Sequence, residues 1–161
     1  MRKIPITLVV LLILFNCLYS CADKTYNSET DIYRKVDSIM SLMTLNEKIG
    51  QTIMYSGDWN KTGPYVTSDN MKLLKEGNLG SMLNVYTSKG TKELQKIAVE
   101  ETRLGIPLLF GYDVIHGFKT IFPINLGIAS SWDLSDVEEV ARISAEEASA
   151  SGVHWTFAPM I

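Results

Sequence analysis

The chain has 161 residues, of which 46% are hydrophobic and 20% are charged, and its formal net charge is −3. This is an ordinary globular composition, sufficient for one modest hydrophobic core. Because there is no basic excess to attract phosphate groups, the composition argues against a nucleic-acid-binding protein.

The N-terminal segment differs from the rest of the chain. Arg2 and Lys3 precede an apolar run over residues 4–15, which predicts an export signal peptide over residues 1–20. The apolar run is short for a stable membrane span. A Leu-Tyr-Ser-Cys sequence resembles the lipobox of bacterial lipoproteins, so we expect Cys21 to carry lipid and to anchor the protein to a membrane. The alternatives are an ordinary signal peptide with an incidental cysteine, and an uncleaved anchor.

Residues 21–30 are polar and lack periodicity, which predicts a tether before a folded domain over residues 31–161. Within that domain, helical spacing of hydrophobic residues predicts the helices, and apolar runs bounded by glycine or polar residues predict the strands. In chain order we expect helix 31–43, a short helix from Thr44 to Gly50, strand 51–55, loop 56–67, helix 68–75, strand 79–86, helix 91–103, strand 106–110, a long loop, helix 134–151 and strand 153–161.

Two helix starts have clear capping residues. Thr44 and Glu47 have the spacing of a capping box, in which each side chain binds the backbone amide of the other residue. Asp133 precedes the longest predicted helix and is expected to cap it. Glu146 and Glu147 are expected on the solvated face of that same helix.

The order of the elements predicts the fold class. Strands alternate with helices, and the strands are apolar runs, which predicts an α/β protein with a parallel sheet covered by helices. About four strand–helix units are present, whereas an eight-unit barrel needs about 250 residues. We therefore expect a partial (β/α)8 TIM barrel, its first half only, and a chain that is a fragment of a longer gene product. A complete small doubly wound domain is the alternative, but it would leave its last strand at an exposed edge.

A carboxylate follows one of the buried strands. Asp113 comes after the run IPLLFGY, and the active sites of α/β barrels lie at the carboxyl ends of the strands. A carboxylate there can accept charge-assisted hydrogen bonds from two neighbouring hydroxyl groups, as a sugar offers. Asp113 could equally cap a helix or brace a loop, and spacing alone does not decide between these roles.

Both histidines are expected to have structural roles. His116 is expected to brace its loop through hydrogen bonds, and His154 is expected to pack within the final strand. Asp113 and His116 could be two ligands of a metal ion, but no further His, Cys or acidic cluster lies nearby in the sequence. The sequence contains no Gly-x-Ser-x-Gly elbow, phosphate-binding loop or dinucleotide fingerprint.

Three ordered blocks carry a family resemblance. LMTLNEKIGQ, RLGIPLLFGYDVIHGFKTIFPINLGIASSWD and ARISAEEASASGVHWTFAPMI together resemble the N-terminal barrel domain of glycoside hydrolase family 3, and most closely its exported bacterial β-glucosidases. The resemblance covers residues 31–161. Composition and periodicity alone do not lead to this family.

The resemblance implies a function. It implies hydrolysis of β-linked sugars, usually β-glucosides, from the non-reducing end by the retaining route, with no metal or cofactor. In the family, the aspartate of the Tyr-Asp-x-x-His-Gly block binds hydroxyls of the sugar in the first subsite, and this role falls on Asp113. The family's nucleophile and acid/base carboxylates would lie beyond residue 161, so this chain alone is expected to be inactive. The expected location is the periplasm or the cell surface.

Two other functions remain open at this stage. The chain could be a short lipoprotein that binds sugars or acts as a scaffold without catalysis. It could also belong to another barrel enzyme that uses Asp113 together with a metal ion.

Overall fold

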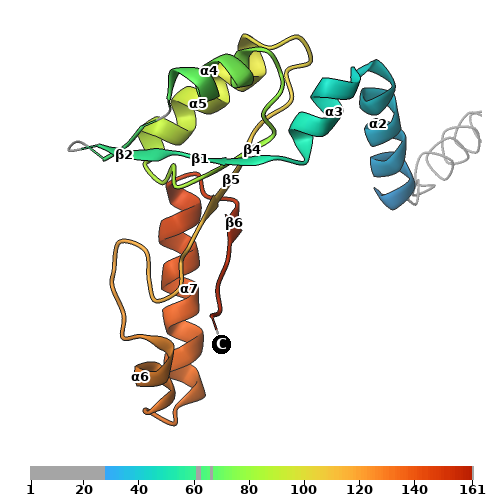
Figure 1. The fold of residues 1–161 in the computed structure, drawn as a ribbon. Coiled ribbons are helices and arrows are strands. Elements are labelled where there is room, and N and C mark those ends of the chain that lie inside the picture. The colour runs from blue at the N-terminus through green and yellow to red at the C-terminus, as the bar shows by residue number, and fades with distance from the viewer. Residues whose placement is uncertain (1–27, 61–62, 66, 161) are drawn as a thin grey trace, which may run out of the picture. The chain divides into compact units, whose positions relative to one another are not determined.

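A parallel sheet organises the chain. The computed structural model describes residues 28–60, 63–65 and 67–160. Its main sheet has four strands in the order β1-β4-β5-β6, and all three pairings are parallel (Figure 1). The strands are β1 (Met54–Ser56), β4 (Ser81–Leu83), β5 (Leu109–Tyr112) and β6 (Trp155–Thr156).

Helices connect these strands. They are α2 (Ser28–Leu42), α3 (Leu45–Gln51), α4 (Ser68–Lys75), α5 (Ser88–Glu100), α6 (Asn125–Ala129) and α7 (Leu134–Ala150). A separate antiparallel hairpin joins β2 (Asp58–Asn60) to β3 (Gly63–Tyr65), where the sequence predicted only a loop. The short helix α6 was not predicted either. No helix in the described part of the chain is both long enough and apolar enough to cross a membrane.

The chain divides into two compact units between Ser38 and Ile39. The first unit contains the beginning of α2, which starts at Ser28, so the predicted tether over residues 21–30 extends too far. The predicted signal peptide and Cys21 lie outside the described residues. The second unit contains the sheet and all the elements from α3 onward.

The strand order distinguishes a barrel from a doubly wound sheet. Neighbouring strands of the main sheet follow one another along the chain without the reversal of order that defines a doubly wound sheet. Helices α4 and α5 pack on one face of this sheet, because Met82 of β4 and Phe110 of β5 lie in the core with residues of these two helices. Consecutive order and one-sided cover are the features of an α/β barrel segment, which confirms the predicted fold class.

Two hydrophobic clusters hold the helices to the sheet. The first surrounds Met82 and Phe110, which are buried, and includes Leu74, Leu79, Val85, Leu94, Ala98 and Leu108. The second joins α7 to the region after β5 and before β6 through Val114, Ala148 and Val153. Some apolar side chains in and next to the sheet stay partly exposed: Leu109 and Phe157 are each 40% exposed, and Trp155 is 47% exposed.

The predicted capping box is present and does more than start a helix. The Thr44 hydroxyl accepts from the Glu47 amide at 3.2 Å, and the Glu47 carboxylate accepts from the Thr44 amide at 2.7 Å. The buried Glu47 carboxylate also accepts from the Arg103 guanidinium at 3.1 and 2.6 Å. This bidentate ion pair lowers the pKa of Glu47 to about 2, with the Thr44 bonds adding to the effect. It ties the start of α3 to the segment after α5.

Gly50 has a different role from the predicted one. Helix α3 continues through it to Gln51, so it does not end the helix. A Cβ atom at this position would lie 2.5 Å from the Asn78 carbonyl carbon. Its carbonyl oxygen also accepts from the Gly80 amide at 2.9 Å. Glycine is needed because two backbone segments touch here.

Candidate functional site

Asp113 lies at the carboxyl edge of the parallel sheet. It follows β5 directly, and its side chain is exposed. The next helix of the described chain, α6, begins only at Asn125, so Asp113 does not cap a helix. No hydrogen bond or ion pair within the described residues holds its carboxylate, which argues against a loop brace as well. The carboxylate is therefore available to an incoming ligand.

Two further polar residues lie at the same edge. Ser56 ends β1 and Asn84 follows β4, and the Asn84 side-chain amide donates to the Ser56 hydroxyl at 2.9 Å. The Asn84 backbone has φ 65, a left-handed conformation that costs a non-glycine residue about 1 kcal/mol. Its amide donates to the Gly111 carbonyl at 3.2 Å. Sequence reasoning missed this pair, although a polar residue directly after an apolar run is the same signal that identified Asp113.

An aromatic cluster supports the segment that carries Asp113. The Tyr86 and Tyr112 ring centroids are 4.9 Å apart, and Phe118 packs edge-on against Tyr112 at 5.7 Å. Burial raises the pKa of the Tyr112 hydroxyl, and the nearby Tyr86 and Asp113 groups add to this effect. Tyr112 therefore stays neutral at physiological pH and supports the edge by packing.

The loop after Asp113 is closed by its backbone and by α7. The Phe122 amide donates to the His116 carbonyl at 2.9 Å, and Gly117 has φ 108, where a Cβ atom would overlap the Thr120 carbonyl oxygen. The His116 side chain does not provide the predicted brace, because its buried Nδ1 has no hydrogen-bond partner among the residues that the structure describes.

Glu147 of α7 provides that brace instead. Its carboxylate accepts from the Lys119 and Thr120 amides at 2.8 Å each, and from the Thr120 hydroxyl at 2.7 Å. These hydrogen bonds lower the pKa of Glu147, and the bonds from Thr120 have the largest effect. The prediction that Glu147 is only a solvated helix residue is therefore wrong. Sequence alone could not show it, since the partners are 27 and 28 residues away. Glu146, in contrast, is exposed and pairs with Arg142 one turn earlier on the same helix.

The remaining polar candidates have structural roles. The Asp133 carboxylate accepts from the Ser135 amide at 2.8 Å, which confirms the predicted cap of α7. The His154 ring lies 5.8 Å from the Phe110 ring in a stacked arrangement, and its Nδ1 accepts from the Phe110 amide at 3.2 Å. His154 thus contacts Phe110, but it is exposed and lies just before β6, so the prediction that it packs within the final strand is wrong. Within the described residues, no three His, Cys, Asp or Glu side chains are placed to hold a metal ion.

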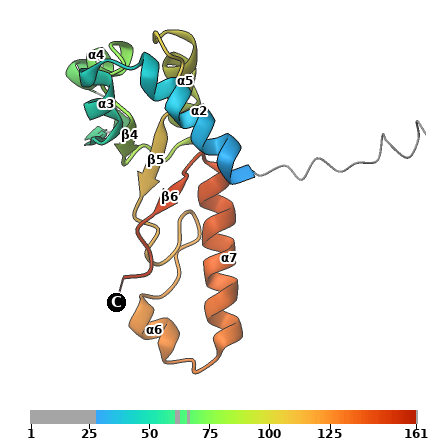
Figure 2. The same ribbon diagram turned by 90° about the vertical axis from the view of Figure 1, so that its right-hand side faces the viewer.

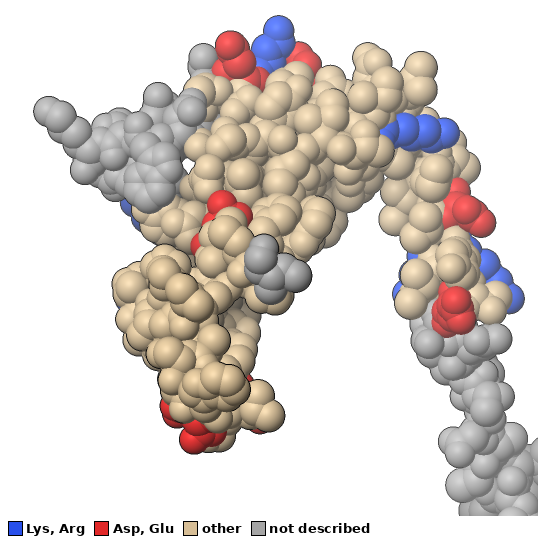
Figure 3. Space-filling view, turned by 60° about the horizontal axis from the view of Figure 1, so that its bottom comes forward, with Lys and Arg blue, Asp and Glu red and all other residues tan. Residues whose placement is uncertain are grey.

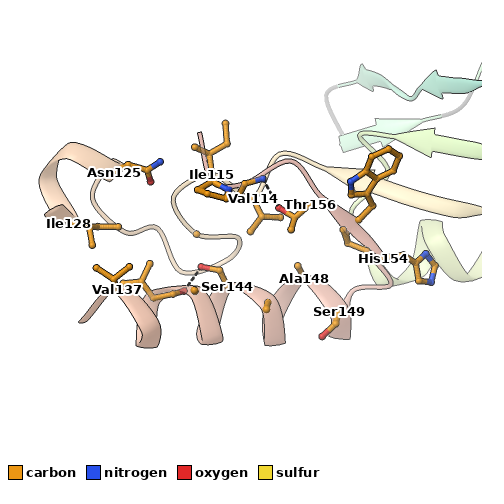
Figure 4. Close-up of a pocket in the computed structure, with 18 of the residues that line it drawn as sticks. Val114, Ile115, Asn125, Ile128, Val137, Ser144, Ala148, Ser149, His154 and Thr156 are labelled. Atoms are coloured by element: carbon orange, nitrogen blue, oxygen red, sulfur yellow. Dashed lines mark hydrogen bonds between the residues drawn. The ribbon is translucent and has the colours of Figure 1, made fainter. Parts of the chain in front are cut away.

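The chain also contains an apolar groove, distinct from the Asp113 edge. It has a volume of about 730 Å³ and lies between α7, α6 and residues 153–159 (Figure 4). Asp113 does not line it, and its walls are mostly alanine, valine and isoleucine side chains. A sugar needs many hydrogen-bonding groups around its hydroxyls, so this groove, called here the α7 groove, is a poor sugar site.

Comparisons with known proteins identify the family. The sequence model described as "Glycosyl hydrolase family 3 N terminal domain" matches residues 44–161. The chain therefore belongs to this family.

Individual relatives agree with the family match. The chain is 39% identical over 127 residues to the periplasmic beta-glucosidase of Salmonella typhimurium, a match that covers 78% of this chain and 16% of the relative. It is 29% identical over 151 residues to the lysosomal beta glucosidase of Dictyostelium discoideum, covering 78% of this chain and 18% of the relative.

Solved structures give the same result for the fold. The beta-glucosidase of Listeria innocua, in a complex with gluconolactone, shares 38% sequence identity with the chain and superposes with a TM-score of 0.66. The match covers 80% of this chain and 19% of that structure. The chain therefore spans less than a fifth of the length of these relatives.

Proposed function

We propose that this chain is the N-terminal part of the catalytic barrel of an exported, β-glucosidase-like glycoside hydrolase. Two kinds of observation support the proposal. The family match and the names of the relatives point to β-glucoside hydrolysis. The observation that carries the proposal is the exposed, unpartnered Asp113 carboxylate at the carboxyl edge of the sheet.

In this proposal Asp113 binds the sugar and does not react with it. A carboxylate has two oxygen atoms that accept charge-assisted hydrogen bonds, and adjacent sugar hydroxyls present matching donors. These bonds hold the ring in register with the reacting groups, and that orientation supplies binding energy for the chemical step. Asp113 lies on a strand end fixed by the Tyr112 cluster, so its position is set before the sugar arrives.

The chain alone is proposed to be inactive. Retaining hydrolysis needs two carboxyl groups that flank the glycosidic bond, one as nucleophile and one as acid and base. Asp133 and Glu147 are engaged in a helix cap and a loop brace. As the family resemblance implies, the nucleophile and the acid/base are proposed to come from polypeptide beyond residue 161. The reaction requires no metal ion or cofactor in this proposal.

The proposed location is outside the cytoplasmic membrane, in the periplasm or at the cell surface. The proposal rests on the signal sequence of residues 1–20 and on the periplasmic location named for the Salmonella relative. The lipobox-like sequence assigns lipid to Cys21, which would attach the protein to a membrane. Treating intact cells with labelled palmitate tests this assignment, because Cys21→Ala would abolish the label if it is correct.

The catalytic proposal can be tested in a chimera. The chain is joined at residue 161 to the part of the Salmonella beta-glucosidase that follows the matched region, and hydrolysis of an aryl β-glucoside is measured. We expect activity from the chimera, none from the chain alone, and a loss in kcat/KM of about 100-fold in Asp113→Asn, because misplacing a bound substrate costs this much. Asp69→Asn, an exposed change on α4, serves as the matched control. An Asp113→Asn chimera as active as its parent would refute the role of Asp113.

A further inference from the structure

The polar groups at the carboxyl edge belong to the face of the sheet opposite α4 and α5. Phe110 lies in the core with these helices, so the neighbouring Gly111 faces the other way. A Cβ atom on Gly111 would lie 3.2 Å from the end of the Met54 side chain, which places Met54 on that opposite face. Because side chains alternate along a strand, Ser56 belongs to the same face as Met54, and Asp113 to the same face as Gly111.

Hydrogen bonds fix the orientation of the Asn84 side-chain amide on this face. The Ser56 hydroxyl donates its one proton to the Gly57 carbonyl at 3.0 Å. It therefore accepts in its bond with Asn84, where the Nδ2 group of the amide is the donor at 2.9 Å. The Oδ1 atom of Asn84 is left without a hydrogen-bond partner within the described residues. Asn84 thus presents a free acceptor oxygen at the edge of the sheet.

The backbone of Asn84 holds the residue in place at a cost. Its φ of 65 is left-handed, a conformation that glycine adopts without penalty, and its amide donates to the Gly111 carbonyl at 3.2 Å. The carboxyl edge of a parallel sheet is where α/β proteins bind their ligands. A strained polar residue at such an edge favours a role in function over a role in stability.

Asn84 and Asp113 lie close together at this edge. Leu83 pairs with Gly111 across β4 and β5, so Asn84 is the first residue beyond this pair on one strand and Asp113 is the second on the other. Neighbouring strands are about 4.8 Å apart and successive residues rise by about 3.3 Å. One small ligand can therefore contact both side chains.

An apolar floor lies on the same face. The Met54 and Phe157 side chains meet over Gly111, each 3.2 Å from the position that a Cβ atom would occupy. Phe157 directly follows β6, which lies beside β5 (Figure 2), and its side chain is 40% exposed. A ligand with hydroxyl groups at its edge and C–H groups on its faces matches this combination of two acceptors and an apolar floor.

We propose that the Asn84 Oδ1 atom is a second sugar-binding group, which accepts a hydrogen bond from a hydroxyl beside those that Asp113 binds. The inference rests on the proposed function, in which Asp113 binds a sugar. Both groups accept hydrogen bonds, so their ligand presents hydroxyl donors and no negatively charged oxygen at this edge. Figure 3, which brings the α6–α7 end forward, shows a largely uncharged surface. The occupant is therefore a neutral sugar rather than a uronic acid or a sugar phosphate.

Replacement of Asn84 by glycine separates binding from stability. Asn84→Gly removes the acceptor and relieves the left-handed strain, which offsets the loss of the exposed bond to Ser56, so the melting midpoint of the chain should change little. In the chimera with the Salmonella beta-glucosidase, kcat/KM for an aryl β-glucoside should fall by about tenfold, the effect of one lost hydrogen bond. The matched control Asn78→Gly, placed before the amino end of β4, should leave kcat/KM unchanged.

Aryl β-glucosides that each lack one ring hydroxyl identify the contact. For the hydroxyl that Asn84 binds, the parent chimera should lose about tenfold in kcat/KM on the deoxy substrate, and the Asn84→Gly chimera should lose nothing further. If every deoxy substrate causes the same loss in both proteins, Asn84 does not touch the sugar and the proposal is overturned.

Saturation-transfer NMR with D-glucose as the probe remains decisive if the chimera is inactive. Glucose binding to the chimera that Asn84→Gly weakens by about tenfold, and that Asn78→Gly does not affect, would uphold the role of Asn84 and refute the proposed catalytic function. An inactive chimera that does not bind glucose, or binds it equally well with Asn84→Gly, would overturn the role of Asn84. An active chimera that Asn84→Gly does not impair would also overturn this role, while leaving the proposed function intact.

Discussion

Replacing Gly50 with alanine puts two physical effects in opposition. Gly50 lies within α3, where alanine is favoured over glycine by about 1 kcal/mol. A Cβ atom, however, would lie 2.5, 2.7 and 2.8 Å from three backbone atoms of Asn78. Backbone cannot rotate away as a side chain can, so α3 must move relative to the segment before β4.

The expected magnitude follows from the contacts that this shift disturbs. Overpacking a close contact costs about 1–3 kcal/mol. The Gly50 carbonyl also accepts from the Gly80 and Ile53 amides at 2.9 and 3.2 Å, and each bond contributes about 1 kcal/mol. After the gain in helix propensity is subtracted, Gly50→Ala should destabilise the protein by about 2–4 kcal/mol. The cost of the steric overlap therefore exceeds the gain in helix propensity.

Urea unfolding followed by circular dichroism measures this difference. With a slope of about 2 kcal/mol per molar urea, the midpoint should fall by about 1–2 M. Gly127→Ala is the matched control, because this exposed glycine of α6 would meet only the Pro123 side chain, at 3.1 Å. A Gly50→Ala protein as stable as wild type, or more stable, would refute the close crossing of the two backbones.

The other two predictions concern buried and half-buried carboxylates. Because the pKa of Glu47 is lowered to about 2 from 4.5, its ion pair with Arg103 stabilises the fold above pH 4.5, and this stabilisation is lost as the pH falls towards 2. Glu47→Gln should be less stable at pH 7 and should lose stability less steeply in that acid range, and an unchanged acid unfolding profile would contradict the assignment. Glu147→Gln should speed hydrogen exchange of the Thr120 amide, whereas Glu146→Gln should not, and equal exchange in both variants would show that Glu147 does not hold the loop.

The sequence is sufficient to predict the order of the main-sheet strands and of the longer helices, and the position of Asp113 at the sheet edge, because these depend on local patterns. Apolar runs between helices define a parallel sheet, and a carboxylate after such a run marks its carboxyl edge. The strand predicted over residues 106–110 is shifted in the structure to Leu109–Tyr112, because the ladder with β4 and β6 continues through Gly111. The local hydrophobic pattern does not determine how β5 is aligned with β4 and β6.

Tertiary contacts explain what sequence reasoning missed. The β2–β3 hairpin spans a Gly-, Asn- and Pro-rich stretch that reads as a loop. The role of Glu147 depends on hydrogen bonds to Thr120, which lies 27 residues earlier in the chain. The role of Gly50 depends on the close approach of its backbone to the backbone of Asn78. These residues have ordinary local contexts, so only the folded arrangement shows what they do.

The size of the native protein tests the central claim most directly. An antibody against residues 31–161 is used to blot a membrane fraction of the source cells. The account predicts a band several times larger than the 18.0 kDa of this chain, because relatives matched over 78% of the chain are covered to less than a fifth of their own length. A single band at 18.0 kDa or slightly below would contradict it, since the cell would then make a chain without the carboxylates that hydrolysis requires.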